Sequence, residues 1–261
     1  MTAFLIGCCA LLGLVIGSFL NVVIHRVPLG VSVASGRSRC PSCGNEIGAL
    51  DNVPVMSWVL LRARCRHCQQ PISARYPAVE LLTAVVFGLL AWRFGYDWAL
   101  PAYLYLGGVG IALAFIDLDT KRLPNALVLP SYPVAAVLFL VPALLDDRWG
   151  DYLHVILGAA ALFAFYFVVA FIYPAGMGFG DVKLAGVLGM YLGWLGWGAV
   201  IVGGFLGFFL GAVVGGTLML TRKAGRKTAI PFGPFMVAGA LIAVFIGPAV
   251  ASWYSTAVLG A

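Results

Sequence analysis

Tyr152-Leu-His-Val-Ile-Leu-Gly-Ala-Ala-Ala-Leu-Phe-Ala-Phe-Tyr-Phe-Val-Val-Ala-Phe-Ile-Tyr173 contains no Asp, Glu, Lys or Arg. A helix that crosses the hydrocarbon core of a bilayer needs about 20 such residues. The whole chain has the same character, since 62% of its residues are hydrophobic, 10% are charged, and the mean hydropathy is +1.01. Soluble proteins are far more polar. The sequence therefore predicts an integral membrane protein with little room for a large soluble domain.

Six further apolar runs occupy residues 3–24, 78–95, 100–117, 124–144, 184–220 and 231–257. The run 184–220 is too long for one helix, and Gly193-Trp-Leu-Gly-Trp-Gly198 places turn-forming glycines and interfacial tryptophans near its middle. We therefore predict an all-α fold of about eight transmembrane helices. No basic residue precedes the first run, which favours a retained helix over a signal peptide.

The basic residues predict the orientation, because Lys and Arg near the ends of spans stay on the cytoplasmic side. With both termini outside, only Arg93 and Arg148 fall on the outer side. The inner set comprises Arg26, Arg37, Arg39, Arg62, Arg64, Arg66, Arg75, Lys121, Arg122, Lys183, Arg222, Lys223, Arg226 and Lys227. The net charge of +6 then reflects topology and contact with anionic lipid, and no nucleic-acid partner is expected.

The sizeable polar segment, 25–77, contains Cys40-Pro-Ser-Cys43 and Cys65-Arg-His-Cys68. Two C-x2-C pairs can present four thiolates to one tetrahedral zinc ion, each pair forming a knuckle. Two disulfides are the alternative, but disulfides are rare in a reducing compartment. We expect a structural zinc on Cys40, Cys43, Cys65 and Cys68, with His67 as an alternative ligand. The predicted division is a first helix at 1–24, this cytoplasmic domain at 25–77, and a polytopic membrane domain at 78–261.

Two aspartates stand at the ends of apolar runs, Asp117 in Ala114-Phe-Ile-Asp117 and Asp181 in Gly176-Met-Gly-Phe-Gly-Asp181. A carboxylate close to hydrocarbon is costly and marks a candidate functional site. The predicted topology puts both on the cytoplasmic side, where a close pair would share one proton and act as base and acid. Such a pair can activate water against a peptide carbonyl. Gly178 and Gly180 would let a substrate backbone approach Asp181.

Structural roles remain open for the same residues. Asp117 and Asp181 could cap helices or pair with Lys121, Arg122 or Lys183, and Asp119 is the better candidate for such a role. Gly17 near the end of the first run could serve close helix packing. Glu80, at the start of the second run, is either an ion-pair partner or a site residue near the membrane surface.

The motifs, taken in order, resemble those of the bacterial type IV prepilin peptidases. The resemblance rests on Gly17-Ser-Phe-Leu-Asn-Val-Val-Ile-His-Arg-Val-Pro28, the two cysteine pairs, Asp51-Asn-Val-Pro54, Arg75-Tyr-Pro-Ala-Val-Glu-Leu-Leu-Thr83, Ile116-Asp117, Leu123-Pro-Asn125, Gly178-Phe-Gly-Asp-Val-Lys183 and Pro231-Phe-Gly-Pro-Phe235. One departure is Ala63, where relatives commonly have glycine.

The resemblance implies a multi-pass aspartyl protease of the bacterial inner membrane that cuts the leader of prepilins or type II secretion pseudopilins after a glycine, on the cytoplasmic side. Asp117 and Asp181 would be its catalytic pair. It also implies N-methylation of the new N-terminus with S-adenosylmethionine, for which Arg75 and Glu80 are candidate binding residues. A peptidase without methyltransferase activity, and a zinc-bearing membrane scaffold, are the alternatives.

Overall fold

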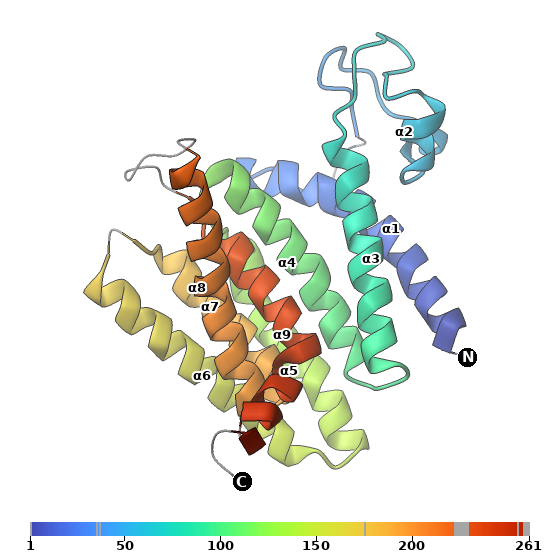
Figure 1. Cartoon of the computed structure of the whole chain (residues 1–261). Helices are drawn as coiled ribbons and strands as arrows, with labels where there is room; N and C mark the ends of the chain where they lie inside the picture. Colours follow the sequence, from blue (N-terminus) through green and yellow to red (C-terminus); the bar gives the residue numbers. More distant parts are fainter. Residues whose placement is uncertain are drawn as a thin grey trace. The chain divides into compact units, whose positions relative to one another are not determined.

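The computed structural model describes residues 2–34, 36, 38–174, 176–221, 230–254 and 256–257 (Figure 1). The elements are α1 (Thr2–Arg26), η1 (Val27–Leu29), η2 (Ala49–Asn52), α2 (Met56–Leu60), α3 (Arg75–Phe94), α4 (Leu100–Thr120), α5 (Asn125–Leu145), α6 (Trp149–Ile172), α7 (Phe179–Trp194), α8 (Trp197–Leu220) and α9 (Gly233–Tyr254). The described residues form only two isolated β-bridges, so the all-α prediction is confirmed. Arg37, Arg222, Lys223, Arg226 and Lys227 lie outside the described residues.

Seven of the described helices are long and apolar enough to cross a membrane, namely α1, α3, α4, α5, α6, α8 and α9. The predicted break within 184–220 is confirmed, because α7 ends at Trp194 and α8 begins at Trp197, with Gly196 at a φ of 99°. The eighth predicted helix, α7, is present as a separate element but is shorter than the other seven. With 16 residues, α7 is about 24 Å long, against about 30 Å of hydrocarbon.

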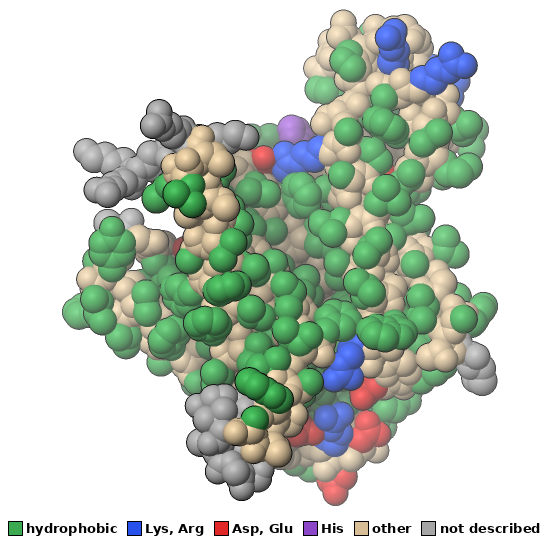
Figure 2. Space-filling model, in the orientation of Figure 1, with side chains coloured by type: hydrophobic (Ala, Val, Ile, Leu, Met, Phe, Trp, Pro, Cys, Tyr) green, Lys and Arg blue, Asp and Glu red, His purple; other side chains and the backbone are tan. Residues whose placement is uncertain are grey.

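Apolar side chains cover most of the face seen in Figure 2. On α8 they follow helical spacing, since Ile201, Phe205 and Phe209 are all exposed. A row of large exposed hydrophobic residues on one side of a helix suits contact with lipid.

The chain divides into two compact units: unit 1 comprises Met1–Leu100 with Gly107–Ala112, and unit 2 comprises Pro101–Leu106 with Leu113–Ala261. Within unit 1, α1 packs on α3 through glycine. A Cβ added to Gly17 would lie 2.7 Å from the Glu80 Cα, and one added to Gly13 would lie 2.7 Å from the Ala84 Cα. Such close backbone contact needs small residues. The packing interpretation of Gly17 is therefore confirmed.

Within unit 2, α7 contacts α5, α6, α8 and α9. Residues 184–194 of α7 are all buried. The contact with α6 is made backbone to backbone, because a Cβ added to Gly158 would lie 2.5 Å from the carbonyl oxygen of Gly189. This short helix is covered by protein on its sides, and it carries Asp181 in its first turn.

Candidate active site and metal centre

Asp117 lies near the end of α4 and is only 4% exposed. Its Oδ2 accepts a hydrogen bond of 3.0 Å from the backbone N–H of Gly233, the first residue of α9. The first N–H groups of a helix have no partner within the helix and favour a negative charge. Asp117 makes no ion pair with a described residue, so the pairing with Lys121 or Arg122 that the sequence left open does not occur.

Asp181 is the third residue of α7 and is half-buried. Its Oδ2 accepts a 3.0 Å hydrogen bond from the N–H of Gly178, while the Asp181 N–H donates to the Gly178 carbonyl. The helix-capping role considered from the sequence is therefore confirmed for Asp181. Capping occupies Oδ2 and leaves Oδ1 for another partner.

The segments around both aspartates converge on Leu123. A Cβ added to Gly233 would lie 3.2 Å from the Leu123 Cδ2, and one added to Gly180 would lie 3.2 Å from the Leu123 Cβ. The fold thus brings segments from three distant parts of the sequence to Leu123, and all of these residues belong to unit 2.

The cation nearest in sequence to Asp181 is engaged elsewhere. Lys183 donates through Nζ to Asn125 Oδ1 at 3.0 Å, and the same Nζ lies 4.9 Å from the centre of the Phe179 ring. Gly178 is exposed, and a Cβ added there would stand at an ordinary 3.4 Å from the Asp181 Oδ2. A ligand backbone therefore has room to reach Asp181 on this side.

Gly233 is a site residue that the sequence reasoning did not single out. Its motif, Pro231-Phe-Gly-Pro-Phe235, contributed to the family resemblance, but its N–H was given no role. The contact joins positions 116 residues apart. No local pattern indicates such a pairing.

The cysteine segments fold into two matching knuckles in unit 1. In the first, the Cys40 N–H donates to the Asn45 carbonyl and the Gly44 N–H to the Cys40 carbonyl, both at 2.9 Å. In the second, the Cys65 and Gln69 N–H groups make the equivalent bonds to Gln70 and Cys65, at 2.9 and 3.0 Å. One isolated bridge closes each knuckle, Arg39 with Glu46 and Arg64 with Pro71.

The four sulfur atoms of Cys40, Cys43, Cys65 and Cys68 lie within 4.8 Å of one another and could hold a metal ion. All four thiols are free, so the disulfide alternative is not found. The predicted tetrad therefore meets in space, and His67 is not part of the cluster.

Backbone donors favour the thiolate form at two of the four cysteines, Cys40 and Cys65. The N–H groups of Cys43 and Ser42 lower the pKa of Cys40 to about 6, and those of Cys68 and His67 lower the pKa of Cys65. Metals bind cysteine as the thiolate, and four sulfur ligands suit tetrahedral zinc. The donor set present here fits that ion.

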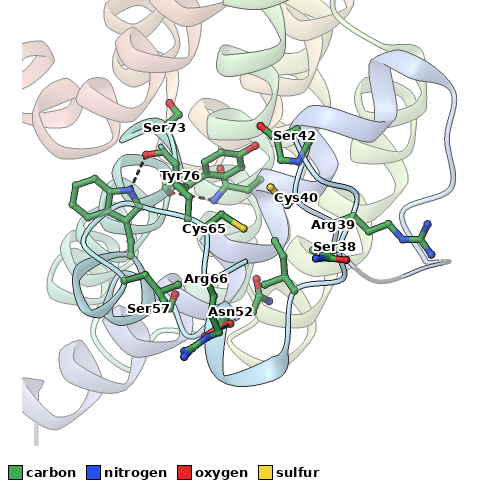
Figure 3. A pocket seen from close by; sticks show the side chains of 18 of the residues that line it. Ser38, Arg39, Cys40, Ser42, Asn52, Ser57, Cys65, Arg66, Ser73 and Tyr76 are labelled. Carbon is green, nitrogen blue, oxygen red and sulfur yellow. Dashed lines mark hydrogen bonds and ion pairs between the residues drawn. The ribbon is translucent and has the colours of Figure 1, made fainter. Parts of the chain in front are cut away.

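Unit 1 also contains a cavity of about 380 Å³ (Figure 3). The end of α1, both knuckles, α2 and the start of α3 line it. Of the two residues predicted to bind a cofactor, Glu80 lines this cavity and Arg75 does not. The Glu80 Oε2 accepts a 2.7 Å hydrogen bond from the Val55 N–H.

These features define a multi-pass membrane protein in which Asp117 and Asp181 stand near helix ends of one unit and four cysteines form a cluster in the other. Residues 11–94 match the model of the bacterial peptidase A24 N-terminal domain, and residues 104–219 match that of the type IV leader peptidase family. The chain belongs to this family, as the sequence resemblance predicted.

Relatives in three bacteria carry the name prepilin leader peptidase/N-methyltransferase. The chain is 34% identical to the protein of Stutzerimonas stutzeri over 95% of this chain and 92% of the relative. It is 38% identical to that of Aeromonas hydrophila, over 94% and 92%, and 39% identical to that of Myxococcus xanthus, over 83% and 64%. No solved structure matches the chain.

Proposed function

We propose that this protein is a membrane aspartyl peptidase that removes the leader of type IV prepilins or pseudopilins and then methylates the new N-terminus. The peptidase is supported by two acids, Asp117 and Asp181, each held through one oxygen by a backbone N–H in segments that both approach Leu123. The names of the relatives support both activities.

The peptidase step follows from two carboxylates that share a proton. The deprotonated aspartate takes a proton from water, whose oxygen attacks the scissile carbonyl carbon. The protonated aspartate then donates to the leaving nitrogen as the C–N bond breaks. The hydrogen bonds from Gly233 and Gly178 hold one oxygen of each carboxylate, which leaves the other oxygen of Asp117 and Asp181 for this chemistry. Gly178 and Gly180 admit the extended backbone around the scissile bond.

We place the site on the cytoplasmic side of a bacterial inner membrane, with both termini outside, because fourteen of sixteen basic residues then face the cytoplasm. The division into a first helix (1–24), a cytoplasmic domain (25–77) and a peptidase domain (78–261) goes with this topology. A prepilin's apolar helix would lie in lipid while its scissile bond reaches the two aspartates at the inner surface.

One zinc ion on Cys40, Cys43, Cys65 and Cys68 would hold the cytoplasmic domain together, since four protein ligands leave no position for a substrate. S-adenosylmethionine would supply an electrophilic methyl group. Transfer of that methyl group to the amine nitrogen of the new N-terminus would leave the bonding pair on sulfur and release one proton from the nitrogen.

The test compares Asp117→Asn and Asp181→Asn with Asp119→Asn, an exposed neighbour on α4. Cleavage of a prepilin by purified enzyme should fall about a thousandfold or more in each of the first two variants. Asp119→Asn should cleave at the native rate. Cleavage that survives both single replacements would refute the proposal.

A further inference from the structure

The cavity of unit 1 has the size and walls of a site for a small organic molecule. Its volume of about 380 Å³ lies within the range of about 300–1,000 Å³ typical of such sites. Its lining combines aromatic side chains, among them Trp58 and Tyr76, with polar ones such as Asn21 and Ser57. Figure 3 shows Tyr76, Ser57 and Asn52 among these side chains.

Hydrogen bonds to the backbone fix these walls in place. The Trp58 Nε1 donates to the Ile72 carbonyl at 3.1 Å, and the Asn21 Nδ2 donates to the Tyr76 carbonyl at 3.2 Å. The first bond ties α2 to the segment after the second knuckle, and the second ties α1 to α3. The cavity is therefore preformed, which reduces the ordering cost of binding.

Three acids line the cavity, and two of them have a cationic partner. Asp51 receives hydrogen bonds from Arg66 at 2.6 and 2.9 Å, and Glu46 receives one from Arg39 at 3.1 Å. Glu80 is different: it is 8% exposed, and its partners are the Val55 N–H and the Ser18 hydroxyl. It forms no ion pair with any described residue.

A buried carboxylate without a counter-ion is costly. The backbone beside it is strained as well, because Val55, a β-branched residue, has a φ of 61° and a ψ of −51°. The Glu80 Oε2 holds this strained residue directly before α2, the helix that carries Trp58. A strained residue bonded to an unpaired, cavity-lining carboxylate supports a functional role for this site.

We propose that this cavity binds the methyl donor and that Glu80 faces its positive charge. This inference rests on the methyltransferase activity proposed above. S-adenosylmethionine carries a sulfonium and an ammonium group, a ribose and a flat adenine. The sulfonium group would supply the counter-ion that Glu80 lacks, while Trp58 and Tyr76 would offer aromatic faces to the cation or the base. The cysteines that line the cavity would be engaged with the metal ion.

Two analogues of S-adenosylmethionine distinguish recognition of its positive charge from recognition of its shape. Sinefungin carries a cationic amine in place of the sulfonium methyl group, whereas S-adenosylhomocysteine is a neutral thioether at that position. We would measure the affinity of the purified full-length protein for each by isothermal titration calorimetry. Glu80→Gln keeps an oxygen acceptor for the Val55 N–H but removes the charge. It should weaken sinefungin about tenfold or more, and S-adenosylhomocysteine by less than about twofold.

The control is Asp147→Asn, which removes an exposed acid from the turn between α5 and α6. Asp147 has a φ of 53°, a conformation that asparagine adopts readily. This variant should bind both analogues as the native protein does. If Glu80→Gln binds sinefungin normally, or loses both analogues equally while its thermal unfolding is unchanged, the assignment of Glu80 is wrong.

A second variant tests the location of the binding site and leaves Glu80 unchanged. Asn52 is an exposed lining residue, so Asn52→Trp would fill the cavity from its rim and should abolish binding of both analogues. Undiminished binding by Asn52→Trp would overturn the location. Prepilin cleavage by the native preparation is assayed in parallel. A native protein that cleaves but binds neither analogue contradicts the proposed methyltransferase activity, whereas analogue binding by the native protein that neither variant changes contradicts the donor site alone.

Discussion

Replacing Gly233 by alanine tests whether the position of the Asp117 carboxylate matters, and it leaves both aspartates in place. The Gly233 N–H donates to the Asp117 Oδ2 at 3.0 Å. An added Cβ would lie 2.9 Å from this same oxygen and 3.2 Å from the Leu123 Cδ2. The leucine methyl can yield, but the carboxylate is held by the hydrogen bond from the residue that now carries the methyl group.

The displacement follows from these distances. Ordinary contact begins at 3.4 Å, so the Asp117 Oδ2 must move away by 3.4 − 2.9 = 0.5 Å. Misplacing a catalytic group by about 1 Å can cost about a hundredfold in rate. We therefore expect kcat for prepilin cleavage to fall about tenfold or more, with a stability cost of about 1 to 3 kcal/mol from overpacking.

The assay is leader cleavage by purified enzyme at saturating prepilin, together with the thermal unfolding midpoint. Gly216→Ala is the control, because Gly216 also lies on a helix of unit 2 and its added Cβ would meet nothing within 4 Å. The control should cleave normally and gain up to about 1 kcal/mol. Native kcat in Gly233→Ala would refute the claim that the position of Asp117 matters for cleavage.

Three further outcomes can be measured. Gly178→Ala should lower stability by no more than about 1 kcal/mol, the effect of alanine at a helix N-cap, since its Cβ would stand at 3.4 Å from its nearest neighbour. It should lower kcat/KM by narrowing the substrate's approach to Asp181, and an unchanged kcat/KM would contradict that role. Gly158→Ala should lower the free energy of unfolding, measured by chemical denaturation, by about 1 to 3 kcal/mol, because its Cβ would meet the Gly189 carbonyl. Gly150→Ala is the control on the same helix; its Cβ would meet nothing within 4 Å, so stability should not fall. Elemental analysis should find one zinc per chain in the native protein and none in Cys43→Ser, and a native protein free of zinc would contradict the metal assignment.

The helices could be predicted because a membrane span is recognised from the length and the apolar composition of its sequence. The break at Gly196 was predictable too, since glycine is needed where φ is positive. The short length of α7 could not be predicted from the sequence. Its apolar run looks like any other, and only the packing of four helices around it shows that protein covers most of its surface.

The candidate site was predictable in its acids and cysteines, because charged or thiol side chains at unusual places stand out in the sequence. The roles of the Gly233 N–H and of the strained Val55 backbone cannot be recognised from the sequence, because both depend on partners distant in the chain. For Glu80 the sequence left an ion pair and a site role equally open. The structure provides no cation for it among the described residues.

The central claim is that Asp117 and Asp181 act as one unit, and a double-mutant cycle tests it most directly. Single-turnover cleavage would be measured for Asp117→Asn, Asp181→Asn and the double variant with enzyme in excess. Residues that act together are strongly non-additive, so the double variant should be no slower than the slower single variant. Losses that multiply, so that the double variant falls by the product of the two single effects, would show that the two aspartates act independently.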